Sequence, residues 1–285
     1  MTEHVTLVEV APRDGLQNEA AIIPVEKKVK LINLLSACGF ARIEAASFVS
    51  PRWVPQMADG AAVLAGIDRR PGTRYAALTP NMKGYAAARD AKADEIAVFA
   101  SASEGFSRAN LNCSVAESLE RFAPIAAAAR ADAVLMRGYV SCVSDCPFDG
   151  PVAPASVARV AGHLYEAGCY EISLGDTLGR ASPERVDAML TAVLEAVPAA
   201  ALAGHFHDTG GVALGNIELS LGRGVRVFDA SAGGLGGCPY APGAAGNVAT
   251  EAVLSLMVRL GYATGIDAAR LGEAAEFARG LRAEA

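Results

Sequence analysis

Two of the four histidines in this 285-residue chain are separated by a single residue, in the stretch GHFHDTGG at 204–211. If this stretch is a β-strand, side chains two residues apart point to the same face, so His205 and His207 project together and Phe206 faces the other way. Two imidazoles on one face can ligate a metal ion. Such a pair can equally be two unrelated polar residues, and Asp208 is placed to cap a following helix. The metal interpretation therefore depends on other ligands reaching the same place.

Further potential ligands follow other apolar stretches that have the character of strands. Arg13 and Asp14 lie just after the first of them, in APRDGLQNE, and Asn247 ends the glycine-rich stretch AGGLGGCPYAPGAAGN. Oxygen ligands from Asp14 and Asn247, combined with two imidazoles, suit Mg²⁺ or Mn²⁺ better than a zinc site rich in thiolates. We therefore expect a divalent metal site formed by Asp14, His205, His207 and Asn247.

Glu44 and Cys238 are the other two residues that stand out. Glu44 interrupts an apolar run, and a buried carboxylate without a partner is costly, so Arg13 is a candidate partner with a purely structural role as the alternative. Cys238 lies inside the glycine-rich stretch, which suits a phosphate cradle or a lid, although no lysine follows it as in a P-loop. The other five cysteines are scattered, and no pair has zinc-ribbon spacing.

A regular alternation of short β-branched runs and alanine-rich helical patterns positions these residues. Eight strands, each followed by a helix, predict a single (β/α)₈ TIM barrel, with a doubly wound sheet as the alternative. Active sites of such barrels lie at the carboxyl ends of the strands, and in a closed barrel the seventh strand is separated from the first only by the eighth, so Asp14 can reach the histidines. Pro24 opens and Gly39 closes one predicted helix, and Ser182 caps another. We expect one domain over residues 1–285, with an extra helical segment at the C-terminus. The predicted strands are 5–10, 41–47, 74–79, 95–100, 134–140, 170–176, 201–208 and 225–231.

The composition limits the partners that this protein can have. The net charge is −6, so no excess of basic residues favours nucleic-acid binding. No apolar run is long enough to cross a bilayer, and the N-terminus has neither the layout of a secretion signal nor the arginine content of a transit peptide. We therefore expect a cytoplasmic protein with reduced cysteines, no membrane contact and no nucleic-acid partner.

Several motifs together resemble the 3-hydroxy-3-methylglutaryl-CoA (HMG-CoA) lyase family of bacterial type, over nearly the whole chain. They are VEVAPRDGLQNE, SFVSPRWVPQM, NLNCS, GCYEISLGDTLG, HFHDT and GLGGCPYAPGAAGNVATE. The resemblance implies that Asp14, His205, His207 and Asn247 match the ligands of a divalent metal, Mg²⁺ or Mn²⁺. It further implies that Arg13 stabilises an enolate, that Glu44 supports this arginine, and that Cys238 is the catalytic cysteine on a loop.

The resemblance also implies a reaction, the retro-Claisen cleavage of HMG-CoA to acetoacetate and acetyl-CoA in leucine and ketone-body catabolism. A small-molecule acyl-CoA is then the substrate, a homodimer is the family expectation, and Arg52, Arg108 and Arg137 are candidates to hold the CoA phosphates.

The chain departs from the family pattern at Gly210, where a tyrosine is usual, and at Ala232 and Gly233 before the cysteine loop. The alternatives are a lyase for a longer-branched 3-hydroxyglutaryl-CoA or a Claisen-type synthase of the same superfamily. A binuclear zinc hydrolase is disfavoured because it needs more histidines, and a non-catalytic metal-binding protein is disfavoured by the combination of Arg13, Glu44 and Cys238.

Overall fold

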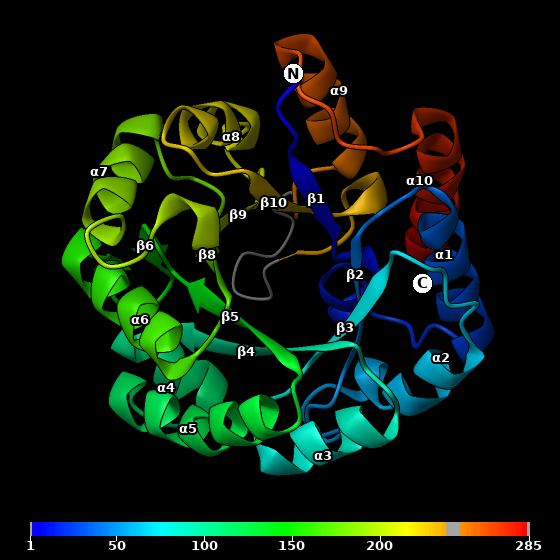
Figure 1. Ribbon diagram of the computed structural model, residues 1–285, viewed down its shortest axis with the longest axis horizontal. Coiled ribbons are helices and arrows are strands. Elements are labelled where there is room, and N and C mark those ends of the chain that lie inside the picture. Colours follow the sequence, from blue (N-terminus) through cyan, green and yellow to red (C-terminus); the bar gives the residue numbers. More distant parts are fainter. Residues whose placement is uncertain (1, 238–245, 284–285) are drawn as a thin grey trace.

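The computed structural model describes residues 2–237 and 246–283, and its main sheet is a closed parallel barrel surrounded by helices (Figure 1). Around the barrel the strands follow the order β1, β10, β9, β8, β5, β4, β3 and β2, so β10 separates β9 from β1. The strands are β1 Thr6–Glu9, β2 Arg42–Ser47, β3 Arg74–Leu78, β4 Glu95–Ser101, β5 Leu135–Ser141, β8 Glu171–Asp176, β9 Leu202–Phe206 and β10 Val227–Ala230. Each of the eight predicted strands is confirmed, and so is the TIM barrel.

The strand ends differ from the predicted limits where loops take over the backbone pairing. β9 ends at Phe206, and His207 pairs instead with Asn247 in an isolated antiparallel bridge. The register between β2 and β3 shifts between Glu44 and Ala46, which is a bulge at the site end of β2. A small hairpin of β6 (Asp145–Cys146) and β7 (Gly150–Pro151) was not predicted, because two-residue strands carry no detectable alternation.

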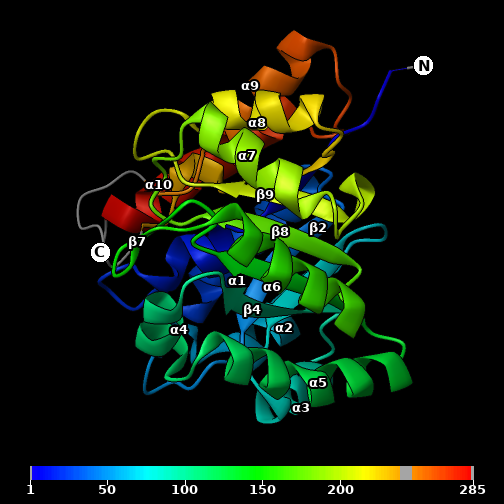
Figure 2. The same ribbon diagram turned by 90° about the vertical axis from the view of Figure 1, so that its left-hand side faces the viewer.

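Helices connect the strands and form the outer layer of the barrel. Figure 2 shows α5, α6, α7 and α8 side by side over the strands. Ser182 is the N-cap of α7 as predicted, and Gly39 follows α1 at a positive φ of 95°. Pro24 lies one position earlier than predicted, at the N-cap of α1. The helices are α1 Val25–Ala37, α2 Gly60–Gly66, α3 Met82–Asp90, α4 Glu104–Leu111, α5 Val115–Ala131, α6 Pro154–Ala167, α7 Pro183–Val193, α8 Ala213–Gly222, α9 Thr250–Leu260 and α10 Ala268–Ala283. Short helical turns are η1 Ala11–Gly15, η2 Pro55–Met57, η3 Ala199–Ala201 and η4 Ala232–Gly234.

The predicted C-terminal helix is α10, which packs beside α1 (Figure 1). Lys30 of α1 lies 4.6 Å above the ring of Phe277 in α10. No helix in the described part of the chain combines the length and the apolar character needed to cross a bilayer.

The barrel encloses charged side chains, whereas its apolar core lies between the strands and the helices. Arg42 at the start of β2 donates two hydrogen bonds to Glu171 of β8, at 2.7 and 2.9 Å. Arg137 of β5 donates to Glu171 at 2.7 Å and to Asp229 of β10 at 2.7 Å. These four residues are at most 4% exposed. Buried charges persist only when they are paired and hydrogen-bonded, so this network ties four strands together across the barrel.

Candidate active site

Arg13 and Asp14 lie in η1, a single π-helical turn directly after β1. Glu9 at the end of β1 holds this turn, because its Oε1 accepts the backbone N–H of Ala11 at 2.8 Å and that of Ala232 at 3.0 Å. Gly15 closes the turn, and a Cβ atom there would lie 2.9 Å from the side chain of Leu235. A glycine is therefore required for the turn to approach the segment that follows β10.

Asp14, His205 and His207 converge at the carboxyl ends of β1 and β9. One potential ligand atom from each of the three lies within 4.8 Å of the other two. The Nε2 atom of His205 is 3.9 Å from Oδ2 of Asp14, and the two imidazole rings have centroids 5.4 Å apart. The Nδ1 atom of His207 is buried and has no hydrogen-bond partner among the described residues. A nitrogen of this kind suits a metal ion, so the observed geometry fits the divalent cation that the sequence predicts.

The charges at this site also suit a cation. Burial alone would raise the pKa of Asp14, but the positive charge of Arg13 and the nearby histidines lower it to about 2. Burial, together with His205, lowers the pKa of His207 to about 4. At neutral pH Asp14 is therefore an ionised carboxylate and His207 a neutral imidazole, which are the forms that bind metals. Burial alone would lower the pKa of His205, but Asp229 and Asp14 raise it, so a metal ion competes with a proton for this ring.

Asn247 reaches the same place through its amide nitrogen. Its Nδ2 donates to Oδ2 of Asp14 at 2.7 Å and to the backbone oxygen of Leu235 at 3.2 Å. The sequence predicts a ligand oxygen here, whereas in this structure the contact with Asp14 is a hydrogen bond from nitrogen. Asn247 is 4% exposed and lies next to the cluster of Asp14, His205 and His207, and its role as a ligand stays a prediction.

Arg13 is held between two carboxylates. Its Nε and Nη2 atoms lie 2.8 and 2.6 Å from Oε2 of Glu44 in β2, and its Nη1 lies 2.7 Å from Oδ1 of Asp14. Burial alone would lower the pKa of Arg13, but the charges of Glu44 and Asp14 raise it overall, so the guanidinium remains a permanent cation. The predicted pair of Arg13 and Glu44 is therefore present, and it lies beside the cluster of Asp14, His205 and His207.

Tyr139 and Asp229 also belong to this site, and sequence reasoning did not select them. The ring of Tyr139 lies between two guanidinium groups, 5.7 Å from that of Arg13 and 4.9 Å from that of Arg137. It also stands edge-on to His205, at 6.2 Å between ring centroids. Asp229 contacts His205 directly, with 3.1 Å between Oδ2 and Nδ1. Their signal in the sequence is a polar residue inside an otherwise apolar strand, the same signal that identified Glu44.

Cys238 lies outside the described residues, but both ends of its segment meet the site. The backbone oxygen of Gly237 accepts a hydrogen bond from Nδ2 of Asn18 at 2.9 Å, in the segment that follows η1. The backbone oxygen of Gly246 accepts one from the N–H of Asp208 at 2.9 Å, just after His207. The chain therefore leaves and returns beside Asp14 and the histidines.

Two expectations about other polar residues have different outcomes. Asp208 contacts the following helix as expected, because its Oδ1 accepts the N–H of Ala213, the first residue of α8, at 3.0 Å. The suggestion that Arg137 holds CoA phosphates is wrong. Its side chain is 2% exposed and is saturated by Glu171 and Asp229 inside the barrel, so a phosphate cannot reach it.

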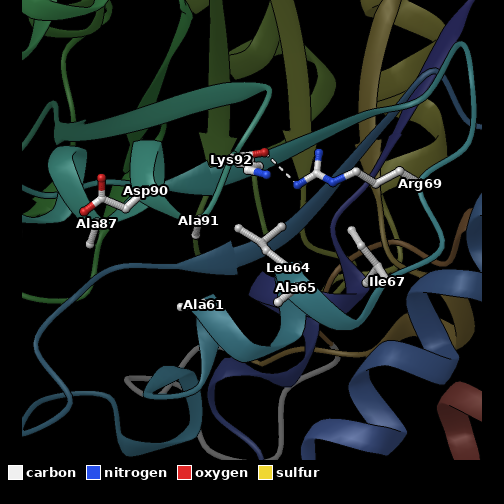
Figure 3. A pocket seen from close by; sticks show the side chains of 9 residues that line it. All are labelled: Ala61, Leu64, Ala65, Ile67, Arg69, Ala87, Asp90, Ala91 and Lys92. Atoms are coloured by element: carbon white, nitrogen blue, oxygen red, sulfur yellow. Dashed lines mark hydrogen bonds between the residues drawn. The ribbon is translucent and has the colours of Figure 1, made fainter.

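A separate surface cavity of about 740 Å³ lies between α2 and α3 (Figure 3). Arg69 and Lys92 close one side, where the guanidinium donates to the backbone oxygen of Lys92 at 2.6 Å. Asp90 and apolar side chains, including Leu64, line the rest. None of the predicted site residues lines this cavity, so it is distinct from the cluster of Asp14, His205 and His207.

Comparisons with known proteins identify the family of this chain. Residues 4–278 match the HMGL-like family. The mitochondrial hydroxymethylglutaryl-CoA lyase of Rattus norvegicus is 54% identical over 277 residues, which cover 97% of this chain and 85% of that protein. A protein of Pseudomonas aeruginosa named 3-hydroxy-3-isohexenylglutaryl-CoA/hydroxymethylglutaryl-CoA lyase is 55% identical over 276 residues, covering 97% of this chain and 92% of that one. The crystal structure of the HMG-CoA lyase from Brucella melitensis is 60% identical, has a TM-score of 0.98 and covers 99% of both chains. The family match, these identities and the shared barrel lead to one conclusion: this chain belongs to the HMGL-like family.

Proposed function

We propose that this protein is an HMG-CoA lyase that cleaves HMG-CoA to acetoacetate and acetyl-CoA with the help of a divalent metal ion. The observation that carries the proposal is the convergence of Asp14, His205 and His207 beside the buried cation Arg13, at the carboxyl ends of the barrel strands. Asp14, His205, His207 and Asn247 are the proposed ligands, and Mg²⁺ or Mn²⁺ is the proposed ion. The chain's high identity to proteins named as lyases supports the same activity.

The cleavage breaks the bond between C2 and C3 of the acyl group. The C3 hydroxyl loses its proton and becomes the ketone of acetoacetate, while the bonding electrons move to C2 and form the enolate of acetyl-CoA. The enolate then takes up one proton at C2, which balances the one lost from the hydroxyl, so the reaction releases no net proton. A bound divalent cation lowers the pKa of the C3 hydroxyl and fixes the orientation of the substrate oxygens. The enolate is the high-energy species, so the protein must stabilise negative charge beside the metal.

Arg13 is suited to this task because its charge and its direction are both fixed. Two of its nitrogens are held by Glu44 at 2.6 and 2.8 Å, and Glu44 is 1% exposed. A cation that is already oriented does not have to reorganise as the enolate forms, which makes its stabilisation effective. We therefore assign enolate stabilisation to Arg13 and the orientation of Arg13 to Glu44.

Cys238 is the proposed proton donor to the enolate. It follows Gly237 directly, and the described ends of its segment contact the site through Asn18 and Asp208. The five cysteines that the structure describes are buried and free, which leaves Cys238 as the candidate for chemistry. A thiol next to a cation and a metal ion has a lowered pKa and can transfer a proton near neutral pH.

A longer branch at C3 is the second candidate substrate, and Gly210 favours it. Gly210 is exposed in the loop between β9 and α8, and it carries no side chain where the family pattern has a tyrosine. The Pseudomonas aeruginosa relative is named for both an isohexenyl and a methyl branch. The Claisen-type synthase has no such support from a particular residue.

A substrate panel tests the proposal directly. Metal-free protein should be inactive toward HMG-CoA, and Mg²⁺ or Mn²⁺ should restore the formation of acetoacetate and acetyl-CoA. Thioesters of 3-hydroxyglutarate with longer C3 branches, assayed in parallel, distinguish the two candidate substrates by kcat/KM. Full turnover without metal, or the absence of turnover on every thioester, would refute the proposed function.

We further propose a cytoplasmic homodimer formed by a single domain of residues 1–285. Arg52 and Arg108 are exposed, and they remain candidates to bind the CoA phosphates now that Arg137 has been ruled out. Light scattering coupled to gel filtration tests the dimer, and Arg52→Ala or Arg108→Ala should raise KM for the CoA thioester without lowering kcat.

A further inference from the structure

The two ring nitrogens of His205 face two different carboxylates. Nε2 points toward Asp14, 3.9 Å from Oδ2, and Nδ1 lies 3.1 Å from Oδ2 of Asp229. A neutral imidazole carries a proton on one nitrogen and a lone pair on the other. An ionised carboxylate only accepts, and of these two only Asp229 lies within hydrogen-bond distance of the ring, so the proton of a neutral His205 belongs on Nδ1 and the lone pair on Nε2 then faces the metal site.

Asp229 is itself held rigidly in the barrel interior. Its Oδ1 accepts a hydrogen bond from Nη2 of Arg137 at 2.7 Å, and its Oδ2 accepts one from Oγ of Ser173 at 2.7 Å. The side chain of Asp229 is fully buried, and Arg137 is in turn anchored by Glu171 at 2.7 Å. These contacts come from β5 and β8, which are separated from the Asp229 strand, β10, by β9. Strands that are not neighbours of β10 therefore fix the position of the Asp229 carboxylate.

We infer that Asp229 is a positioning residue for metal binding, which selects the tautomer of His205 and holds its ring toward the ion. This inference rests on the proposed metal site of Asp14, His205 and His207. A carboxylate behind a metal-bound histidine fixes the ring orientation and makes the ligand nitrogen more basic. The ring of His207 is supported differently, by a hydrogen bond with the backbone at Thr177, while its Nδ1 has no partner among the described residues, so a carboxylate supports one histidine of the pair, His205.

The variant Asp229→Asn tests this inference, because it is isosteric but carries a donor in place of one oxygen. Arg137 donates from Nη2 to Oδ1 at 2.7 Å and from Nη1 to Oδ2 at the longer distance of 3.2 Å, so we expect the remaining oxygen of the amide to take the position of Oδ1. The amide nitrogen will then face His205 and donate to Nδ1, which forces the proton onto Nε2. That is the wrong tautomer for a ligand, and the effect is the same as in other enzymes where an aspartate behind a histidine is replaced by asparagine.

The measurement is the affinity of metal-free, full-length protein for Mn²⁺, from the electron paramagnetic resonance signal of the free ion. We expect Asp229→Asn to weaken binding by about 10-fold to 100-fold. Glu171→Gln is the matched control, because it also replaces a buried carboxylate of the same network but has no contact with either histidine. We expect the control to change Mn²⁺ affinity by less than about threefold, although both variants lose thermal stability, since both break a buried ion pair.

The outcomes separate the inference from the proposed function. If the wild-type protein binds no Mn²⁺, or if His207→Ala binds it equally well, the proposed metal site fails. If the wild type binds Mn²⁺ and Asp229→Asn binds it within threefold, only the inference fails. Equal weakening in Asp229→Asn and Glu171→Gln would also overturn the inference, because the effect would then follow from loss of the network.

A second measurement needs no variant and remains decisive if Asp229→Asn does not fold. Wild-type protein labelled with ¹⁵N-histidine and saturated with Mg²⁺ gives the protonation state of each ring nitrogen in long-range ¹H–¹⁵N spectra. We expect His205, assigned by its loss in His205→Gln, to carry its proton on Nδ1 and none on Nε2. A proton on Nε2 would overturn the inference.

Discussion

Arg13→Lys is the sharpest test of the proposed mechanism, because it keeps the charge and removes the geometry. Arg13 places Nε and Nη2 against Glu44 and Nη1 against Asp14, at 2.6–2.8 Å. A lysine offers one nitrogen, so it can replace at most one of these directions. The ammonium will pair with one of the two carboxylates and will not be held where the enolate develops.

The size of the effect follows from the loss of an oriented donor. Removing one donor that stabilises a developing oxyanion costs about 3–4 kcal/mol, or about 10²–10³ in kcat. Substrate binding depends on the whole CoA thioester, so KM should change by no more than about threefold. The assay is steady-state formation of acetoacetate with Mg²⁺ or Mn²⁺ saturating, at several substrate concentrations.

Arg42→Lys is the control for a general disturbance of the barrel. Arg42 is equally buried, lies two residues before Glu44 on β2, and forms a two-pronged ion pair with Glu171. Both variants should lose thermal stability, and only Arg13→Lys should slow the reaction. An effect of Arg13→Lys confined to KM, or an equal fall in kcat for Arg42→Lys, would refute the assignment of Arg13 to the transition state.

Three further predictions follow from the site and its surroundings. His207→Ala should keep its fold by circular dichroism and lose bound Mg²⁺ or Mn²⁺ by elemental analysis; unchanged metal content would remove His207 from the ligand set. Cys238 should be alkylated before the five described cysteines, which are buried, and a product analogue should protect both the thiol and the activity; inactivation with Cys238 unlabelled in peptide mapping would contradict its role. Burial raises the pKa of Glu9 from 4.5 to about 7, so folding takes up a proton between these pH values and the free energy of unfolding falls as pH rises through them. Glu9→Gln should reduce this fall by about 3 kcal/mol between pH 4.5 and 7 in urea titrations, and parallel curves for the two proteins would argue against it.

The strands and the faces of their side chains could be predicted from the sequence. The short β-branched apolar runs that mark the strands are local patterns, and the spacing of His205 and His207 places both on one face whatever the rest of the chain does. Barrel closure then brings Asp14 near the histidines, because β10 alone separates β1 from β9. The pair of Arg13 and Glu44 could also be anticipated, since a carboxylate inside an apolar strand needs a cation.

The partners of the buried charges were decided by the tertiary structure. Arg137 has the residue type of a phosphate ligand, and only the closed barrel shows that Glu171 and Asp229 enclose it. Asp229 reaches His205 because β9 and β10 are neighbours in a register that pairs these two residues. The amide nitrogen of Asn247 likewise reaches Asp14 because the backbone of Asn247 pairs with His207 in an isolated bridge. No periodic pattern in the sequence predicts such a bridge. Local patterns determine which side of a strand a residue occupies, whereas contacts between charges from four strands depend on the stagger of those strands, which exists only when the barrel is closed.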